Sequence, residues 1–287
     1  MSRRWQELFL VDLPLMLHIM KNVRDLAIAT LITLLTCSCS RKEGGIIIAG
    51  STSVQPFIEQ VAEHYMEEHP DITVNVQGGG STAGIQATTN GTCNIGASSR
   101  NLKVHEKGLI IVLIAVDGIA VIVHRDNPVS TLTVEQIQGI FAGGITQWSE
   151  LGGKDGPIIP VTREEGSGTR GAFEDMIMGE VVISDACLVQ DSNGAVREII
   201  ATTPQGIGYI SVGLVDEREK AVSIDGHEPS LVNLISQKYR FTRPFLLLLR
   251  EEPKGVCKDF IEYTLSDKGQ EILRKGGLIP AKDVQDD

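Results

Sequence analysis

The residues best suited to chemistry in this sequence lie between Arg163 and Arg170, in the stretch REEGSGTR. A strand-like run at 157–161 leads into this stretch, and residues 171–178 have the pattern of a helix. Glycine, serine and threonine at the start of a helix present free backbone N–H groups and hydroxyls beside the positive end of the helix dipole. Together with the charge of Arg163, this turn is typical of an anion-binding site.

Two other turns have the same composition. They are GSTS at residues 50–53 and GGGST at residues 78–82, and each lies between a strand-like and a helix-like run. One such turn says little, because serine and threonine are also the usual N-caps of helices. Three in one chain suggest that a single oxyanion is held from several sides.

Alternating strands and helices must position these turns. The predicted strands are 46–49, 72–76, 93–97 and 157–161, and the predicted helices are 54–68, 81–89, 133–141 and 195–201. Such alternation predicts an α/β protein whose sheets are mostly parallel, with ligands at the carboxyl ends of the strands.

Two longer segments need an interpretation of their own. Residues 110–123 are apolar except at Asp117-Gly118, and we interpret them as two extended segments. Residues 256–274 predict one long amphipathic helix with Phe260, Ile261 and Leu265 on its inner face.

Length and charge exclude some classes of function. The 287 residues suffice for one large domain or two ordinary ones. The formal net charge of −11 argues against a nucleic-acid-binding face. No CxxC pair occurs, so we expect no structural zinc, and we expect no cofactor. The late cysteines Cys93, Cys187 and Cys257 permit one disulfide or none.

The first 39 residues have the pattern of a secretory leader. Lys21 and Arg24 precede an apolar run at 26–35, which is followed by TCSCS. A cysteine at the expected cleavage point suggests a lipoprotein with lipid on Cys37 or Cys39, and a signal peptide with incidental cysteines is the alternative. Residues 1–19 could be an upstream extension of a start at Met20. We expect secretion across the cytoplasmic membrane, to the periplasm or to an anchored position on its outer side.

The ordered motifs resemble the substrate-binding proteins of phosphate ABC transporters. The stretches that carry the resemblance are AGSTS at 49–53, QGGGSTAG at 77–84, IGASSR at 95–100, REEGSGT at 163–169, FAGGITQW at 141–148 and GIGY at 206–209. It extends from about residue 46 to 281. It implies a two-lobed periplasmic-binding-protein fold of type II, with residues 45–123 and 244–287 in lobe I and residues 124–243 in lobe II.

By the same resemblance the protein is not an enzyme. It would bind inorganic phosphate and deliver it to the permease of an ABC transporter, with no nucleic-acid partner and as a monomer. The phosphate-binding residues carried over are Ser51, Thr52, Ser53, Ser81, Ser99, Arg100, Arg163, Ser167, Gly168 and Thr169. The resemblance also implies that Glu165 orients the guanidinium of Arg163.

One departure from the family affects selectivity. Some members carry an aspartate after the Gly-Ala-Ser stretch, where it accepts a proton from phosphate and repels sulfate. This chain has Ser99 and Arg100 there. Serine can accept a hydrogen bond without contributing charge. Arg100 is either a second positive contact or the partner of a carboxylate near the hinge.

Each residue also has an alternative role. The serines and threonines could only cap helices, and Arg163 could form a salt bridge with Glu164 or Glu165. The same fold could take sulfate, molybdate or another tetrahedral oxyanion. A secreted hydrolase with Ser167 as nucleophile is a weaker alternative, because Glu165 replaces the first glycine of a Gly-x-Ser-x-Gly elbow and no histidine is an obvious base.

Overall fold

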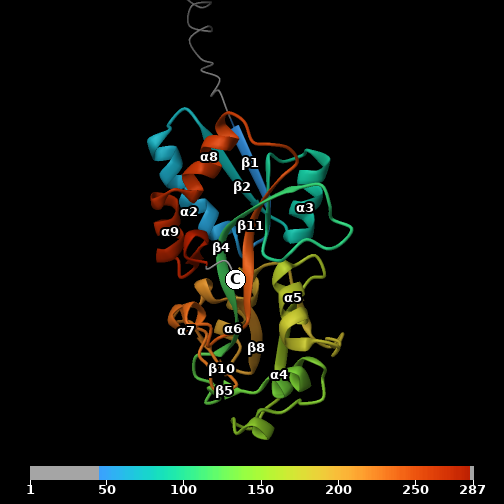
Figure 1. The fold of residues 1–287 in the computed structure, drawn as a ribbon. Helices are drawn as coiled ribbons and strands as arrows, with labels where there is room; N and C mark the ends of the chain where they lie inside the picture. The colour runs from blue at the N-terminus through green and yellow to red at the C-terminus, as the bar shows by residue number, and fades with distance from the viewer. Residues whose placement is uncertain (1–44, 285–287) are drawn as a thin grey trace, which may run out of the picture. The chain divides into compact units, whose positions relative to one another are not determined.

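The computed structural model of the protein describes residues 45–284. The predicted leader, with Cys37 and Cys39, therefore lies outside the described residues. Within 45–284 the chain forms two groups of strands and helices, which we call lobe I and lobe II. They are joined by two long strands, β4 (Ile110–His124) and β11 (Thr242–Leu249), which extend from one group to the other in Figure 1.

Lobe I contains three parallel strands with helices between them, as predicted. Its elements are β1 (Gly45–Gly50), α2 (Gln55–Glu68), β2 (Thr73–Gly78), α3 (Ser81–Asn90) and β3 (Ile95–Ser98). β1 is central and pairs in parallel with β2 and β3. The carboxyl ends of the three strands therefore lie at one edge of the sheet, where the turns that follow them meet.

Lobe II repeats this arrangement. Its main elements are α4 (Val134–Phe141), β6 (Ile159–Arg163), α5 (Gly168–Phe173), β7 (Leu188–Gln190), α6 (Asn193–Thr202) and β8 (Gly206–Ser211). β6 pairs in parallel with β7 and β8. α5 continues directly into a π-helical turn, η2 (Glu174–Met178). Shorter elements are β5 (Thr131–Leu132), η1 (Trp148–Leu151), η3 (Val212–Leu214), β9 (Glu219–Ala221), β10 (Ser223–Ile224) and α7 (Leu231–Ile235).

The connecting strands make the sheet mixed. β4 pairs antiparallel with β11 in lobe I and with β8 in lobe II, and β11 pairs antiparallel with β3. The predicted break in residues 110–123 is wrong, because Asp117 and Gly118 pair with Arg243 and Thr242 and the ladder continues through them.

The predicted helix at 256–274 is two helices, α8 (Val256–Leu265) and α9 (Asp267–Lys275). Ser266 separates them with an extended backbone, and its hydroxyl accepts a hydrogen bond from the N–H of Gly269. The break also leaves the side chain of Leu265 41% exposed, so the prediction that it faces inward is wrong. The chain then forms β12 (Ile279–Pro280), which pairs with β4, and η4 (Ala281–Asp283).

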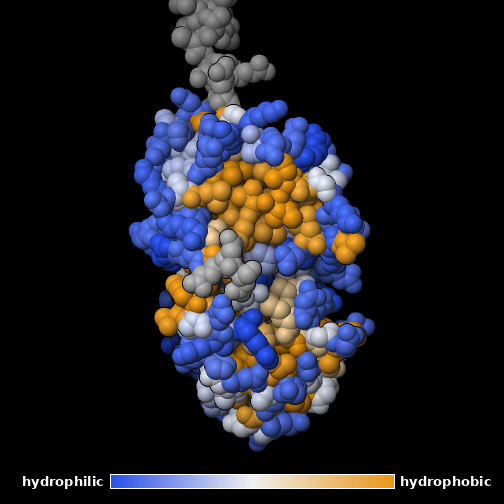
Figure 2. Space-filling view, viewed as in Figure 1, coloured by the Kyte–Doolittle hydropathy of each residue, from blue (hydrophilic) through white to orange (hydrophobic). Residues whose placement is uncertain are grey.

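Each lobe has its own hydrophobic core. In lobe I, Phe57 and Tyr65 of α2 pack with Phe245 of β11 and Phe260 of α8. On the other face of this sheet, Leu246 and Leu248 of β11 pack with Ile85 of α3 in a smaller cluster. Figure 2 shows an apolar area over the part of lobe I where β4 and β11 lie.

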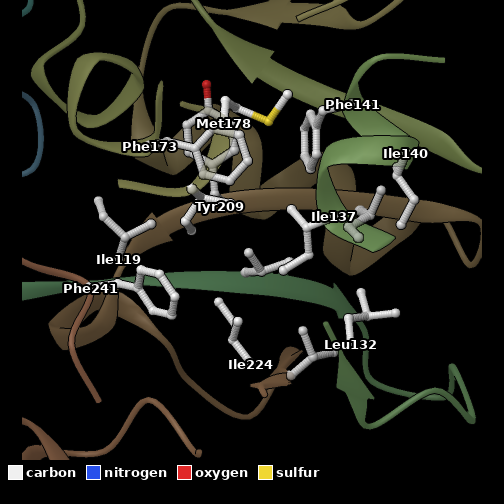
Figure 3. Close-up of a cluster of buried hydrophobic side chains, with 14 of the residues drawn as sticks. Ile119, Leu132, Ile137, Ile140, Phe141, Phe173, Met178, Tyr209, Ile224 and Phe241 are labelled. Atoms are coloured by element: carbon white, nitrogen blue, oxygen red, sulfur yellow. The ribbon is translucent and has the colours of Figure 1, made fainter. Parts of the chain in front are cut away.

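The lobe II core is built around aromatic rings. Figure 3 shows Phe141, Phe173 and Tyr209 side by side, with Ile119 of β4 and Phe241 nearby. The rings of Phe173 and Tyr209 stack with centroids 3.9 Å apart and an interplanar angle of 5°. This rigid cluster lies next to the strand that ends at Arg163, because the hydroxyl of Tyr209 accepts a hydrogen bond from the N–H of that residue.

Candidate anion-binding site

The three turns predicted from the sequence meet in the structure. Two of them, after β1 and β2, belong to lobe I and lie beside the end of β3. Ser51 Oγ donates to Ser99 Oγ at 2.9 Å, and the N–H of Ser99 donates to Ser81 Oγ at 3.1 Å. Ser53 Oγ lies 2.9 Å from Ser51 Oγ. All four serines are buried, so the ends of three strands form one cluster of hydroxyls.

The third turn brings lobe II against this cluster. The N–H of Thr82, in α3, donates to the carbonyl of Gly166 at 3.1 Å. Gly168 lies so close to Ser81 and Ser99 that a Cβ at this position would collide with both hydroxyl oxygens. Ser167 caps α5, since its Oγ accepts from the N–H of Arg170 at 3.2 Å. Sequence-distant turns are therefore in direct contact across the two lobes.

Arg163 is held in place from both lobes. Its Nε and Nη2 donate to the two carboxylate oxygens of Glu164, each at 3.0 Å. Nε also donates to the carbonyl of Gln190, and Nη2 to the carbonyl of Asp191, both at 3.1 Å. Nη2 reaches lobe I as well, donating to Thr52 Oγ1 at 3.2 Å. Two of its three nitrogens are thus used by the protein.

The third nitrogen of Arg163 is different. The side chain is 1% exposed, and Nη1 is buried without a hydrogen-bond partner within residues 45–284. Burying a charged N–H group without an acceptor destabilises the folded protein by on the order of several kcal/mol. An anionic acceptor placed against Nη1 would remove this penalty.

The backbone of Arg163 is fixed by the lobe II core. The hydroxyl of Tyr209 lies 2.6 Å from Thr162 Oγ1, and Arg170 Nη1 donates to the carbonyl of Arg163 at 2.9 Å. Burial raises the pKa of Tyr209 to about 12, so its hydroxyl keeps its proton at neutral pH. The guanidinium of Arg163 is therefore preorganised rather than mobile.

The guanidinium of Arg100 donates its hydrogen bonds to other residues of lobe I. Arg100 Nη1 and Nη2 donate to the two oxygens of Glu106 at 2.7 and 2.8 Å. The remaining bonds go to the carbonyl of Asn101 and to Thr82 Oγ1. The hydrogen bonds from Arg100 hold the pKa of Glu106 at about 2. Of the two roles predicted for Arg100, the geometry favours the pairing with a carboxylate.

The residue that orients Arg163 is Glu164. Glu165 is exposed, and Arg163 donates no hydrogen bond to it among the described residues. Glu164 directly follows Arg163 in an extended segment, so its carboxylate can reach the guanidinium. The turn after Glu164 directs Glu165 to solvent. The role implied for Glu165 is therefore filled by its neighbour.

The sequence analysis missed Arg243. Its Nε and Nη2 donate to Asp117 Oδ2 at 3.0 and 2.9 Å, and its Nη1 donates to Ser99 Oγ at 3.3 Å and to Thr169 Oγ1 at 2.9 Å. Ser211 Oγ donates to the other oxygen of Asp117 at 2.8 Å. Burial raises the pKa of Asp117, opposed by Arg243 and Ser211, and burial lowers the pKa of Arg243. A charged residue inside an apolar run was the signal available for Asp117.

Asn193 was missed as well. It is the first residue of α6, and its Nδ2 donates to Thr52 Oγ1 at 3.3 Å, the same oxygen that accepts from Arg163. Two residues of lobe II therefore donate hydrogen bonds to Thr52 in lobe I. No signal in the sequence connects Asn193 with a turn more than a hundred residues earlier.

Residues 45–284 contain no group of three or more histidine, cysteine, aspartate or glutamate side chains placed to hold a metal ion. No helix in the same range combines the length and apolar character needed to cross a membrane.

Comparisons with known proteins extend over most of the chain. A family model described as a PBP superfamily domain matches residues 38–268. The phosphate-binding protein PstS of Bacillus subtilis (strain 168) is 34% identical over 251 residues, which cover 85% of this chain and 83% of that protein.

Two solved structures are similar in fold and sequence. One, from Clostridium perfringens, is described as a phosphate ABC transporter substrate-binding protein with bound phosphate. It is 41% identical, covers 83% of this chain and 99% of its own, and has a TM-score of 0.80. The other, an ABC-type phosphate transport receptor from Vibrio cholerae, is 37% identical, with a coverage of 82% and 99% and a TM-score of 0.67. These matches confirm the predicted α/β, two-lobed periplasmic-binding-protein fold of type II.

Proposed function

Because the chain belongs to the PBP superfamily, and within it to the PstS family of phosphate-binding proteins, we propose that it binds inorganic phosphate outside the cytoplasmic membrane and delivers it to the permease of a phosphate ABC transporter. The protein performs no chemistry on the ligand. It captures phosphate between its lobes and releases it when the permease separates them.

The observation that carries the proposal is Nη1 of Arg163, which has no hydrogen-bond partner within the described part of the chain. This nitrogen is buried, and its guanidinium is fixed by Glu164 and donates to Thr52 across the lobes. Hydrogen bonds to an ionised ligand contribute roughly 1.5–3 kcal/mol each, so a few of them support tight binding after dehydration and lobe closure.

We assign the predicted binding residues to two groups. The first group supplies the charge, hydroxyls and N–H groups around the anion, and it consists of Arg163, Thr52, Ser81, Ser99, Ser167, Gly168 and Thr169. Ser51 and Ser53 hold the hydroxyl network, since Ser51 donates to Ser99 and lies within hydrogen-bond distance of Ser53. Arg100 and Glu165 are left outside the binding set.

We further propose that the lobes meet at Asp117 and Arg243 rather than at residues 123 and 244. Packing supports this boundary, since Ile119, Val121 and Val123 belong to the lobe II core and Ile114 belongs to the lobe I core. Hinge motion would then bend β4 and β11 at the level of one buried ion pair.

The predicted leader, the lipid on Cys37 or Cys39 and the monomeric state remain predictions. The PstS relatives support a location outside the cytoplasmic membrane, because phosphate-binding proteins of ABC transporters work there. The hydrolase alternative has little support, because Ser167 Oγ accepts the N–H of Arg170 as a helix cap and has no histidine partner among the described residues.

Calorimetric titration of the full chain, stripped of bound anion, tests the proposal with phosphate and then with sulfate. We expect tight phosphate binding and little heat from sulfate. Equal binding of both would favour a receptor for tetrahedral oxyanions in general, and no heat from either would overturn the proposed function.

A further inference from the structure

Arg243 lies where both connecting strands pass between the lobes, and it contacts residues of each. Asp117 on β4 holds two of its nitrogens, and the third reaches Ser99 of lobe I and Thr169 of lobe II. The side chains of Arg243 and Asp117 are 2% and 0% exposed. Such a pair is costly to bury unless its geometry is good and its other bonds are satisfied, and both conditions hold here.

The hydrogen bond from Arg243 limits the hydrogen bonds that the Ser99 hydroxyl can still form. A hydroxyl has one proton to donate and two lone pairs to accept with. Ser99 Oγ already accepts from Ser51 Oγ at 2.9 Å and from Arg243 Nη1 at 3.3 Å. Both lone pairs are therefore used, and only the proton of Ser99 is left. Its other close oxygen, Ser81 Oγ at 3.4 Å, lies at the far end of hydrogen-bond range.

Thr169 is biased in the same direction. Its Oγ1 accepts from Arg243 Nη1 at 2.9 Å, which turns a lone pair toward the arginine and the proton away from it. Arg243 Nη1 thus orients one hydroxyl group in each lobe, that of Ser99 and that of Thr169, to donate a hydrogen bond. A ligand oxygen that carries a proton is a weaker acceptor than an ionised oxygen, so a donor at this place favours the ionised form of the ligand.

We propose that Arg243 is a positioning residue that makes Ser99 and Thr169 hydrogen-bond donors, so that the site selects HPO₄²⁻ over H₂PO₄⁻. This inference rests on the proposed phosphate binding. It implies that Ser99 cannot accept a hydrogen bond from phosphate, because both of its lone pairs are used, so discrimination against sulfate must come from other groups of the site.

The groups around Arg243 leave two sources of pH dependence, the ligand and Asp117, whose pKa burial raises. Asp117 on β4 and Arg163 on β6 face it, Tyr239 lies near Asp117, and Glu164 pairs with Arg163. No histidine is among these groups. Burial and Asp117 raise the pKa of Tyr239, so this phenol does not ionise near neutrality. The second ionisation of phosphate does occur there.

The test is calorimetry of the full chain with inorganic phosphate at a series of pH values spanning that ionisation. The double variant Asp117→Asn/Arg243→Gln removes both charges, so that no unpaired charge is left buried. Arg100→Gln/Glu106→Gln is the matched control, because it removes a second buried arginine–carboxylate pair whose side-chain hydrogen bonds do not involve Ser99 or Thr169.

The wild type and the control should bind more tightly as the fraction of HPO₄²⁻ rises. The Asp117→Asn/Arg243→Gln protein should bind about tenfold more weakly at the high-pH end, the loss expected for a few disturbed hydrogen bonds to an ion, and should have a flatter pH profile. An unchanged affinity and slope, or an equal loss at every pH, would overturn the positioning role.

Thr169→Val provides a second measurement if the double variant does not fold. It removes one prepared donor and leaves the Asp117–Arg243 pair intact, so it should also flatten the pH profile. A wild-type profile in a folded Thr169→Val protein would contradict the inference. Failure of the wild type to bind phosphate at any pH would instead overturn the proposed function itself.

Discussion

Arg100 and Arg163 are alike in sequence context and different in what they can bind. Each lies at or just past the end of a strand, is buried, and is paired with a carboxylate close by in the chain, Glu106 for Arg100 and Glu164 for Arg163. In Arg100 both terminal nitrogens donate within the protein. In Arg163, Nη1 has no partner among the described residues.

The difference shows that burial and charge do not by themselves make an anion site. A guanidinium carries five N–H groups in a fixed plane, and a neighbour on each edge can use them all. An arginine is available to a ligand where the fold leaves one edge free. Arg163 meets this condition and Arg100 does not.

The largest expected effect on phosphate affinity distinguishes Arg163 from Arg100. Arg163→Ala should weaken phosphate binding about 100-fold or more, as expected when one partner of a buried charged contact is truncated. Arg100→Ala should change the affinity by less than about threefold, since its charge is used by Glu106. Calorimetric titration of both folded variants measures the ratio, and equal losses would invalidate the distinction.

A glycine in the contact between the lobes should give the next largest effect. A Cβ at Gly168 would collide with Ser81 Oγ and Ser99 Oγ, so Gly168→Ala should hold the lobes apart and weaken binding about tenfold. Gly171→Ala, in the same helix, is the control, because the nearest atom to its Cβ would be Arg100 Cδ at an ordinary 3.4 Å. Similar affinities for the two variants would argue against closure at Gly168.

The carboxylate beside Arg163 should have a smaller effect. Glu164→Gln removes the charge that fixes two nitrogens of the guanidinium and should weaken phosphate binding about threefold to tenfold. Glu165→Gln, one residue on and exposed, should bind as the wild type does. The reverse order of affinities would restore the orienting role to Glu165.

The smallest effect on binding, and a visible one on stability, belongs to Glu106. Its pKa falls to about 2 in the folded protein, from 4.5 for a free side chain, because Arg100 stabilises the carboxylate. A lowered pKa contributes stability that is present above the unfolded value and lost as the pH falls toward the folded one. Glu106→Gln should therefore reduce the free energy of unfolding by about 1–2 kcal/mol at neutral pH.

Urea unfolding at a series of pH values checks this expectation. The difference between the wild type and Glu106→Gln should shrink between pH 4.5 and about 2, the interval set by the two pKa values. A difference that stays constant over this interval would show that Arg100 and Glu106 are not coupled in the folded state.

The order of local elements could be predicted from the sequence because the forces that set it act over a few residues. Glycine, serine and threonine after an apolar run mark the turns at 50–53 and 78–82, and the helices that follow them form within one residue of the predicted starts. The PstS resemblance rests on the same turns. Arg163 and the three hydroxyl-rich turns were therefore found from sequence alone.

The contacts that determine whether an arginine nitrogen is available to a ligand could not be predicted from neighbouring residues. Asp117 and Arg243 are 126 positions apart and meet only because β4 and β11 pair antiparallel. Likewise, Arg100 and Arg163 differ through the acceptors that surround them, and those acceptors come from distant segments in the case of Arg163.

The amino-acid sequence by itself determined where the three hydroxyl-rich turns lie, since turn and helix-start chemistry depends on neighbouring residues. Only the tertiary structure decided which donors remain free for the anion. A hydrogen bond between side chains requires that the atoms come within about 3 Å, and for residues distant in the chain that distance is set by the packing of the two lobes.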